Sequence, residues 1–124
     1  MIEHEVNYHT NGNKSYEQYY LNGKCHNENG PAYISYYENG NKYYEEYYLN
    51  DKRHNTNGPA IISYDTNGNI KYEYYYLNGL YHNNNGPAII DYYEKSEHYY
   101  LNNERVYVNS IEEFKTYLKT LILK

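Results

Sequence analysis

Three histidines recur every 28 residues, at His26, His54 and His82, and histidine is a common metal ligand. The ligands of one zinc ion lie about 2 Å from the metal. Equivalent residues of successive repeats in a sheet lie two strands apart, or about 10 Å. We therefore expect no metal site here, and we expect each imidazole ring to form a hydrogen bond within its own loop.

A single cysteine, Cys25, adjoins His26, and a thiolate beside a histidine can act as a nucleophile. Neighbouring side chains on an extended chain, however, point in opposite directions. The same position of the next two repeats holds Arg53 and Tyr81, so the repeat does not need a thiol there. We expect no covalent catalysis at Cys25, and a lone cysteine forms no internal disulfide.

Glutamates recur at the same spacing, at Glu17, Glu45 and Glu73, with Glu46 beside one of them. Paired carboxylates about 5–10 Å apart can act as acid and base. This row arises from repetition and does not converge in a cleft, so we expect structural carboxylates that are solvated or hydrogen-bonded to tyrosine. The sequence predicts no catalytic residue, no metal site and no cofactor, and we expect a protein that is not an enzyme.

The 23 tyrosines are the strongest candidates for function, because tyrosine offers a large contact area and is enriched at interfaces. We predict two sets of partner-binding residues. The repeated tyrosines expected on one face are Tyr20, Tyr48, Tyr76 and Tyr100. The variable loop residues that could adjust specificity are Lys52, Arg53 and Tyr81. The pattern leaves open which face of the sheet is packed.

A repeated unit positions these residues. The octapeptide Asn-x-Asn-Gly-Pro-Ala-x-Ile occurs at 27–34, 55–62 and 83–90, and a fixed period indicates one small unit stacked on itself. We interpret residues 1–124 as a single repeat domain. Its parts are an N-terminal half repeat 1–18, the repeats 19–46, 47–74 and 75–98, a truncated repeat 99–109 and a capping helix 110–124.

Each repeat is predicted to form two strands. Residues 60–65 alternate with period two, and residues 66–69, Thr-Asn-Gly-Asn, suit a tight hairpin turn. A second strand is expected over 72–77, followed by a long loop over 78–87. The predicted fold class is mainly β, a single-sheet antiparallel β-meander of about eight strands.

The last segment is predicted to be an amphipathic α-helix that closes the sheet. Ser110 and Glu113 have the spacing of a capping box. One apolar stripe consists of Ile111, Phe114, Leu118, Leu121 and Ile122. An open edge or face of such a sheet promotes aggregation, and we expect the helix to cover it. The alternative is a helix presented to a partner, or to a second copy in a homodimer.

Residues 44–54, Tyr-Glu-Glu-Tyr-Tyr-Leu-Asn-Asp-Lys-Arg-His, resemble a MORN repeat, whose pattern is Tyr-Glu-Gly-Glu-Trp-x-Asn-Gly-Lys-x-His-Gly. The variant Asn-Gly-Lys-x-His-x-x-x-Gly-Pro-Ala is similar to a repeat found in proteins of tailed phages, giant viruses and AT-rich bacteria. Residues 108–114 resemble the helix that closes such arrays. The resemblance implies a stacked β-repeat fold and a scaffolding role, sometimes with phosphoinositides as ligands.

Charge and composition narrow the classes of partner. The net charge of −5 disfavours duplex nucleic acid and anionic membranes, because both need clustered lysine and arginine. Residues 1–10 lack the apolar core of a signal peptide, and no run approaches the ~18 apolar residues of a membrane span. We expect a cytoplasmic protein, located in the host-cell cytoplasm if a phage encodes it.

Three functions are compatible with these observations. The leading hypothesis is a non-enzymatic protein–protein interaction module that binds through a Tyr-rich sheet face or its loop edge. A narrower form is an inhibitor of a host defence complex, encoded by a phage or mobile element. Such an anti-CRISPR-like protein would occlude a nuclease or mimic nucleic acid. A different class is a glycan- or cell-wall-binding repeat, in which aromatic rings stack on sugars.

Overall fold

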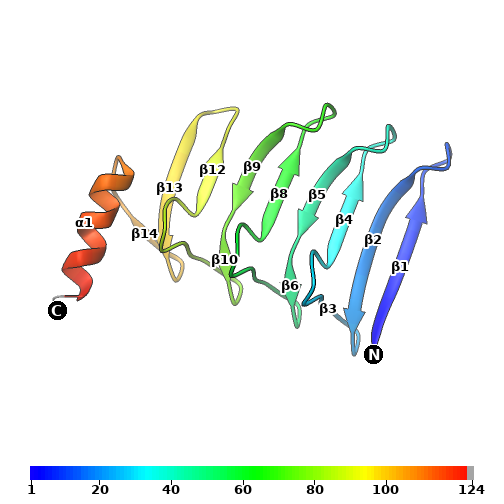
Figure 1. Ribbon diagram of the computed structural model, residues 1–124, viewed down its shortest axis with the longest axis horizontal. Coiled ribbons are helices and arrows are strands. Elements are labelled where there is room, and N and C mark those ends of the chain that lie inside the picture. The colour runs from blue at the N-terminus through cyan, green and yellow to red at the C-terminus, as the bar shows by residue number, and fades with distance from the viewer. Residues whose placement is uncertain (123–124) are drawn as a thin grey trace.

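The computed structural model describes residues 1–122, and it shows one long antiparallel sheet with a helix at its C-terminal end (Figure 1). The strands of the main sheet lie side by side in chain order. They are β1 (Ile2–Tyr8), β2 (Lys14–Leu21), β4 (Tyr33–Tyr36), β5 (Lys42–Glu46), β8 (Ile61–Tyr64), β9 (Ile70–Tyr74), β12 (Ile89–Asp91), β13 (Ser96–Leu101) and β14 (Glu104–Val106). The predicted mainly β, single-sheet antiparallel meander closed by a C-terminal helix is confirmed.

Shorter strands form a second set of hairpins at one end of the repeats, which we call the hairpin end. They are β3 (Lys24–Cys25), β6 (Tyr48–Leu49), β7 (Lys52–Arg53), β10 (Tyr76–Leu77) and β11 (Leu80–Tyr81). β3 pairs with β2, β6 pairs with β7, and β10 pairs with β11. The expected strand over 72–77 is therefore interrupted. β9 ends at Tyr74, and the segment predicted as a long loop begins with the turn of a second hairpin.

Past Tyr74 the chain keeps contact with the next repeat, because the backbone N–H of Tyr75 donates to the carbonyl of Ala88 at 2.7 Å. The turn of the second hairpin then has a positive φ at both central residues, 50° at Asn78 and 82° at Gly79. This is the backbone that a two-residue type I′ turn requires. Positive φ values also occur in the corresponding turns, at Asn22-Gly23, Asn50-Asp51 and Asn102-Asn103.

The strand register sorts the side chains into two faces. Partners across an antiparallel pair lie on the same side, and successive residues of one strand lie on opposite sides. We call the side with Tyr44, Tyr72 and Tyr74 the tyrosine face. The other side, the glutamate face, carries a row that alternates glutamate and isoleucine across successive strands. This row is Glu17, Ile34, Glu45, Ile62, Glu73, Ile90 and Glu97.

The buried residues form small clusters because the main sheet is a single layer. One cluster joins Ala60, Ile61 and Tyr76, with partly buried tyrosines packed around it. The alanine of each Gly-Pro-Ala motif is fully buried, at Ala32, Ala60 and Ala88. A larger side chain at these positions would have to displace its neighbours, which explains the constant alanine.

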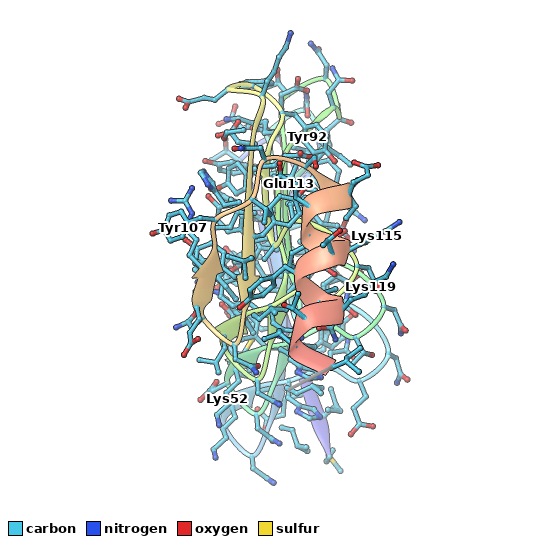
Figure 2. The ribbon with its side chains drawn as sticks, turned by 90° about the vertical axis from the view of Figure 1, so that its left-hand side faces the viewer. Lys52, Tyr92, Tyr107, Glu113, Lys115 and Lys119 are labelled. Carbon is cyan, nitrogen blue, oxygen red and sulfur yellow. The ribbon has the colours of Figure 1, made fainter. Side chains whose placement is uncertain are left out.

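Helix α1 (Ile111–Ile122) covers the glutamate face at the end of the sheet. Phe114 is fully buried against Tyr99 and Val106, and the rings of Phe114 and Tyr99 lie 4.8 Å apart. Figure 2 looks at this end of the molecule and shows α1 on one side of the sheet and Tyr107 on the other. The apolar stripe is only partly used, since Leu121 is 42% and Ile122 is 82% exposed.

Ser110 caps the helix as predicted, and the return bond of the capping box goes to Asn109, one residue before the cap. Ser110 Oγ accepts a hydrogen bond from the backbone N–H of Glu113 at 3.2 Å, and the Glu113 carboxylate accepts one from Asn109 N–H at 2.9 Å. The predicted helix range, 110–124, ends at residues 123–124, which lie outside the described residues. Within residues 1–122, no helix has the length and apolarity to cross a membrane.

Candidate functional site

The repeated tyrosines lie at the hairpin end of the tyrosine face, and those from Tyr48 to Tyr100 form a continuous row. Each faces the variable residue five positions later. The pairs are Tyr20 with Cys25, Tyr48 with Arg53, Tyr76 with Tyr81, and Tyr100 with Arg105. Arg53 and Tyr81 each lie against the tyrosine of the next repeat as well, so predicted residues from separate repeats meet in one surface.

Two of these variable residues bridge neighbouring repeats. The guanidinium of Arg53 lies 5.9 Å from the ring centre of Tyr48 and 5.5 Å from that of Tyr76, within cation–π range of both. Tyr81 stacks on Tyr76 at 4.4 Å and lies 5.2 Å from Tyr100. Cation–π contacts of Arg53 and ring contacts of Tyr81 therefore join the tyrosines of neighbouring repeats into one row.

A hollow of about 320 Å³ lies beside this row. It is lined by Tyr44, Glu46, Arg53, Ile61, Tyr72, Tyr74, Tyr76 and Tyr81. The hydroxyls of Tyr44 and Tyr72 form a hydrogen bond at 2.8 Å, and the rings of Tyr72 and Tyr74 stack at 4.7 Å. The hollow therefore offers aromatic walls together with hydroxyl groups that can donate or accept hydrogen bonds.

One ion pair lies at the rim of the hollow. Arg53 Nε lies 3.8 Å from a carboxylate oxygen of Glu46, which also accepts a hydrogen bond from the Tyr48 hydroxyl at 3.2 Å. The hydrogen bond with Tyr72, followed by burial, raises the pKa of Tyr44, and burial raises the pKa of Tyr76. Neutral phenols and a single pair of opposite charges therefore define the chemistry of the surface.

The predicted partner-binding residues differ in exposure. Tyr76 is only 7% exposed and belongs to a buried cluster, whereas Tyr48 and Tyr81 are half-buried. The remaining two tyrosines of the row, Tyr20 and Tyr100, are also half-buried. Lys52 and Arg53 are exposed in β7, and Figure 2 shows Lys52 near the hairpin end of the sheet.

Sequence reasoning missed four residues of this surface, Tyr44, Glu46, Tyr72 and Tyr74. The available signal was the period-two alternation of Tyr72, Tyr74 and Tyr76, which places all three side chains on one side. The same alternation of Tyr44, Glu46 and Tyr48 places Glu46 on this side, and the register that pairs it with Ile61 agrees.

The repeated histidines connect successive repeats, and the prediction that each bonds within its own loop is wrong. Nδ1 of His26 accepts a hydrogen bond from Asn50 N–H, and Nδ1 of His54 accepts one from Asn78 N–H, both at 2.9 Å. His82 bonds Asn102 in the same way. The acceptor role of Nδ1 places the proton on Nε2. Within residues 1–122, no cluster of His, Cys, Asp or Glu could hold a metal ion.

Three carboxylates of the glutamate row accept hydrogen bonds from tyrosine hydroxyls, as predicted for a structural row. The donors are Tyr36 to Glu17, Tyr64 to Glu45 and Tyr92 to Glu73. Burial opposes ionisation of Glu17, but hydrogen bonds from Tyr36, Lys14 and His4 outweigh it, so the pKa of Glu17 is lowered. Cys25 is buried beside Gln18, and burial raises the pKa of its thiol, which opposes thiolate formation.

Two equivalent hollows lie on the glutamate face, between successive Asn-Gly-Pro loops. The first, of about 640 Å³, has Tyr47, Leu49 and Ile62 in its lining, with the loops 27–30 and 55–59 around them. The second, of about 440 Å³, has the residues 28 positions later, including Tyr75 and Leu77. Each combines an aromatic ring and aliphatic side chains with asparagine amides.

Comparison with family models, curated proteins and solved structures finds no match for this chain.

Proposed function

We propose that the protein is a non-enzymatic module that binds another protein through its tyrosine face. The observation that carries this proposal is the continuous row from Tyr48 to Tyr100 with a hollow beside it. Tyrosine and arginine are the side chains that most often dominate binding energy at interfaces. The only helix of residues 1–122 packs on the opposite face, which leaves these rings available.

Two arrangements in the chain argue against catalysis. The only thiol is buried, and the repeated carboxylates accept hydrogen bonds from tyrosines in place of a substrate. The resemblance to MORN repeats supports the same assignment, because that family is linked to scaffolding.

Inhibition of a host defence complex is a narrower form of this proposal. Glu17 and Glu45 are 7% and 8% exposed and Glu73 is half-buried, so these three glutamates do not present charge like a nucleic-acid backbone, and Glu97 alone in the row is exposed. Occlusion of the target by the tyrosine face is the form of inhibition that this geometry favours.

The experiment is affinity capture followed by mass spectrometry, with variants that use residues the repeat already accepts. The position of Cys25, Arg53 and Tyr81 tolerates three different side chains, so Arg53→Tyr and Tyr81→Arg should fold normally. Thr56→Glu is the matched control, because Glu28 occupies the same place in the preceding repeat.

We expect the original chain and the Thr56→Glu variant to capture the same partner protein in similar amounts. The doubly exchanged variant should recover about tenfold less or worse, equivalent to about 1.4 kcal/mol. Equal recovery by all three chains, with folding confirmed by circular dichroism, would exclude the tyrosine face as the binding surface.

A glycan is the second candidate ligand, and the two equivalent hollows on the glutamate face favour it. A tyrosine ring can stack on a sugar, and the asparagine amides around it can bond hydroxyls. The test is a glycan array with the original chain and Tyr75→Ala, with Tyr107→Ala as the control for an exposed tyrosine elsewhere. An array without signal removes this candidate and leaves the protein-binding proposal unaffected.

A further inference from the structure

The outer edge of β1 ends the main sheet on the side opposite α1 (Figure 1). Within residues 1–122, β1 pairs only with β2. Alternate backbone N–H and C=O groups along Ile2–Tyr8 therefore point away from the sheet. Such an edge is a template on which another extended chain can add a strand.

Tyr8 occupies the repeat position of Tyr36, Tyr64 and Tyr92. Each of those three donates its hydroxyl hydrogen bond to a glutamate 19 residues earlier, on the preceding strand. The strand register shifts immediately before Tyr8, as it does before Tyr36 and Tyr64, so the backbone has the same irregularity. Within residues 1–122 no strand lies outside β1, and Tyr8 is 63% exposed.

Val6 indicates the register of a missing neighbour. On its inner side it pairs with Glu17. The equivalent isoleucines each pair with a glutamate on both sides, and they are Ile34, Ile62 and Ile90. A strand added outside β1 in the repeat register therefore places a glutamate opposite Val6, where the Tyr8 hydroxyl can bond it.

The negative charges of β1 on the tyrosine face indicate which residues follow the glutamate in the added strand. Glu3 and Glu5 are exposed on the tyrosine face. The Glu5 carboxylate accepts hydrogen bonds from the Tyr16 hydroxyl and the Asn7 amide, and no ion pair in residues 1–122 involves either glutamate. In an antiparallel strand, the residue after the glutamate lies opposite Glu5, and the residue two further on lies opposite Glu3. Lysine or arginine at both places complements these carboxylates.

We propose that the outer edge of β1 binds an extended peptide of another protein, antiparallel and in this register. The peptide carries a glutamate opposite Val6, followed by basic residues opposite Glu5 and Glu3. A second copy of the chain fits poorly, because antiparallel pairing about Glu5 opposes Glu5 to itself, and pairing about His4 opposes Glu3 to Glu5. Pairing about Val6 opposes Val6 to itself and therefore puts no glutamate opposite Val6. This site lies at the β1 edge, apart from the part of the tyrosine face around Arg53 and Tyr81, and it does not rest on the function proposed for that face.

The probe is the labelled peptide Ser-Tyr-Glu-Lys-Tyr-Lys-Leu, titrated with the full chain and followed by fluorescence anisotropy. Tyr8→Phe removes one hydroxyl and should weaken binding about fivefold. Replacing the glutamate of the peptide by glutamine should have little further effect on that variant. The control is Tyr107→Phe, at an exposed tyrosine at the other end of the sheet, which should leave binding unchanged.

A charge exchange tests the register independently. Glu5→Lys should weaken binding about fivefold, and a peptide with glutamate in place of its first lysine should restore it. Circular dichroism verifies that each variant is folded. Exchange of residues 53 and 81 should not alter peptide binding, which separates this site from the binding surface proposed around Arg53 and Tyr81.

Three results would overturn the proposal. The first is no saturable binding of the peptide by the folded original chain. The second is binding that neither Tyr8→Phe nor Glu5→Lys changes. The third is dimerisation in sedimentation experiments that Glu5→Lys alters, because a second copy would then be the occupant of the edge.

Discussion

The three tyrosine–glutamate hydrogen bonds of the glutamate face form a graded series within one chain. Tyr64→Phe removes a donor from Glu45, which is 8% exposed and keeps Lys42 at 3.0 Å. A hydrogen bond to a charged group contributes roughly 1.5–3 kcal/mol, so we expect a loss of about 2 kcal/mol in the free energy of unfolding. With a slope of about 1.5 kcal/mol/M, the urea midpoint falls by about 1.3 M.

The other two substitutions should cost less for identifiable reasons. Tyr36→Phe leaves Glu17 with Lys14 and His4, each at 3.2 Å, so we expect about 1 kcal/mol. Tyr92 is 46% exposed, and water can replace its hydroxyl, so Tyr92→Phe should cost about 0.5 kcal/mol or less.

The assay is urea unfolding of each variant by circular dichroism, with the slope checked against the original chain. Adding Glu45→Gln to Tyr64→Phe completes a double-mutant cycle that isolates the hydrogen bond. Equal losses for all three tyrosine variants would show that burial and remaining donors do not set the contribution. A coupling near zero between Tyr64 and Glu45 would refute the reasoning outright.

Three further results are expected. Burial and the hydrogen bonds to glutamate raise the pKa values of Tyr36 and Tyr64, so the folded state holds these protons more tightly than the unfolded state. The free energy of unfolding should therefore fall as pH rises above about 10, which urea midpoints at increasing pH would measure. Phe114→Ala should cost about 3–4 kcal/mol, and hydrogen exchange should show protection lost first in β13 and β14. His54→Ala should cost about 1 kcal/mol and speed exchange of the Asn78 amide, whereas unchanged exchange would contradict the assigned bond.

The meander could be predicted from the sequence because the period of 28 residues aligns every strand and turn with its counterparts. The second hairpin was missed although Asn22-Gly23 and Asn78-Gly79 carry the signal for it. In the middle repeat the same turn is Asn50-Asp51, which has positive φ without glycine and hides the pattern.

Contacts that cross from one repeat to the next were the least predictable part. The histidine bonds join residues 20–24 positions apart in different repeats, and no local pattern indicates such a partner. The open face was also undetermined, because tyrosines such as Tyr74 and Tyr75 lie on opposite sides of the sheet. The position of α1 on Tyr99 decides between them.

The histidine bonds have a consequence for the length of the molecule. Each joins a repeat only to its immediate successor, as do the asparagine bonds from Asn39 and Asn41 to the Thr66 carbonyl in the turns. A unit such as 47–74 could therefore be duplicated without leaving a donor or acceptor unmatched at the new junction, because each copy supplies the same turn carbonyl and asparagine amides. The length of the sheet would then grow by about 10 Å with each added unit, while both ends keep their structure.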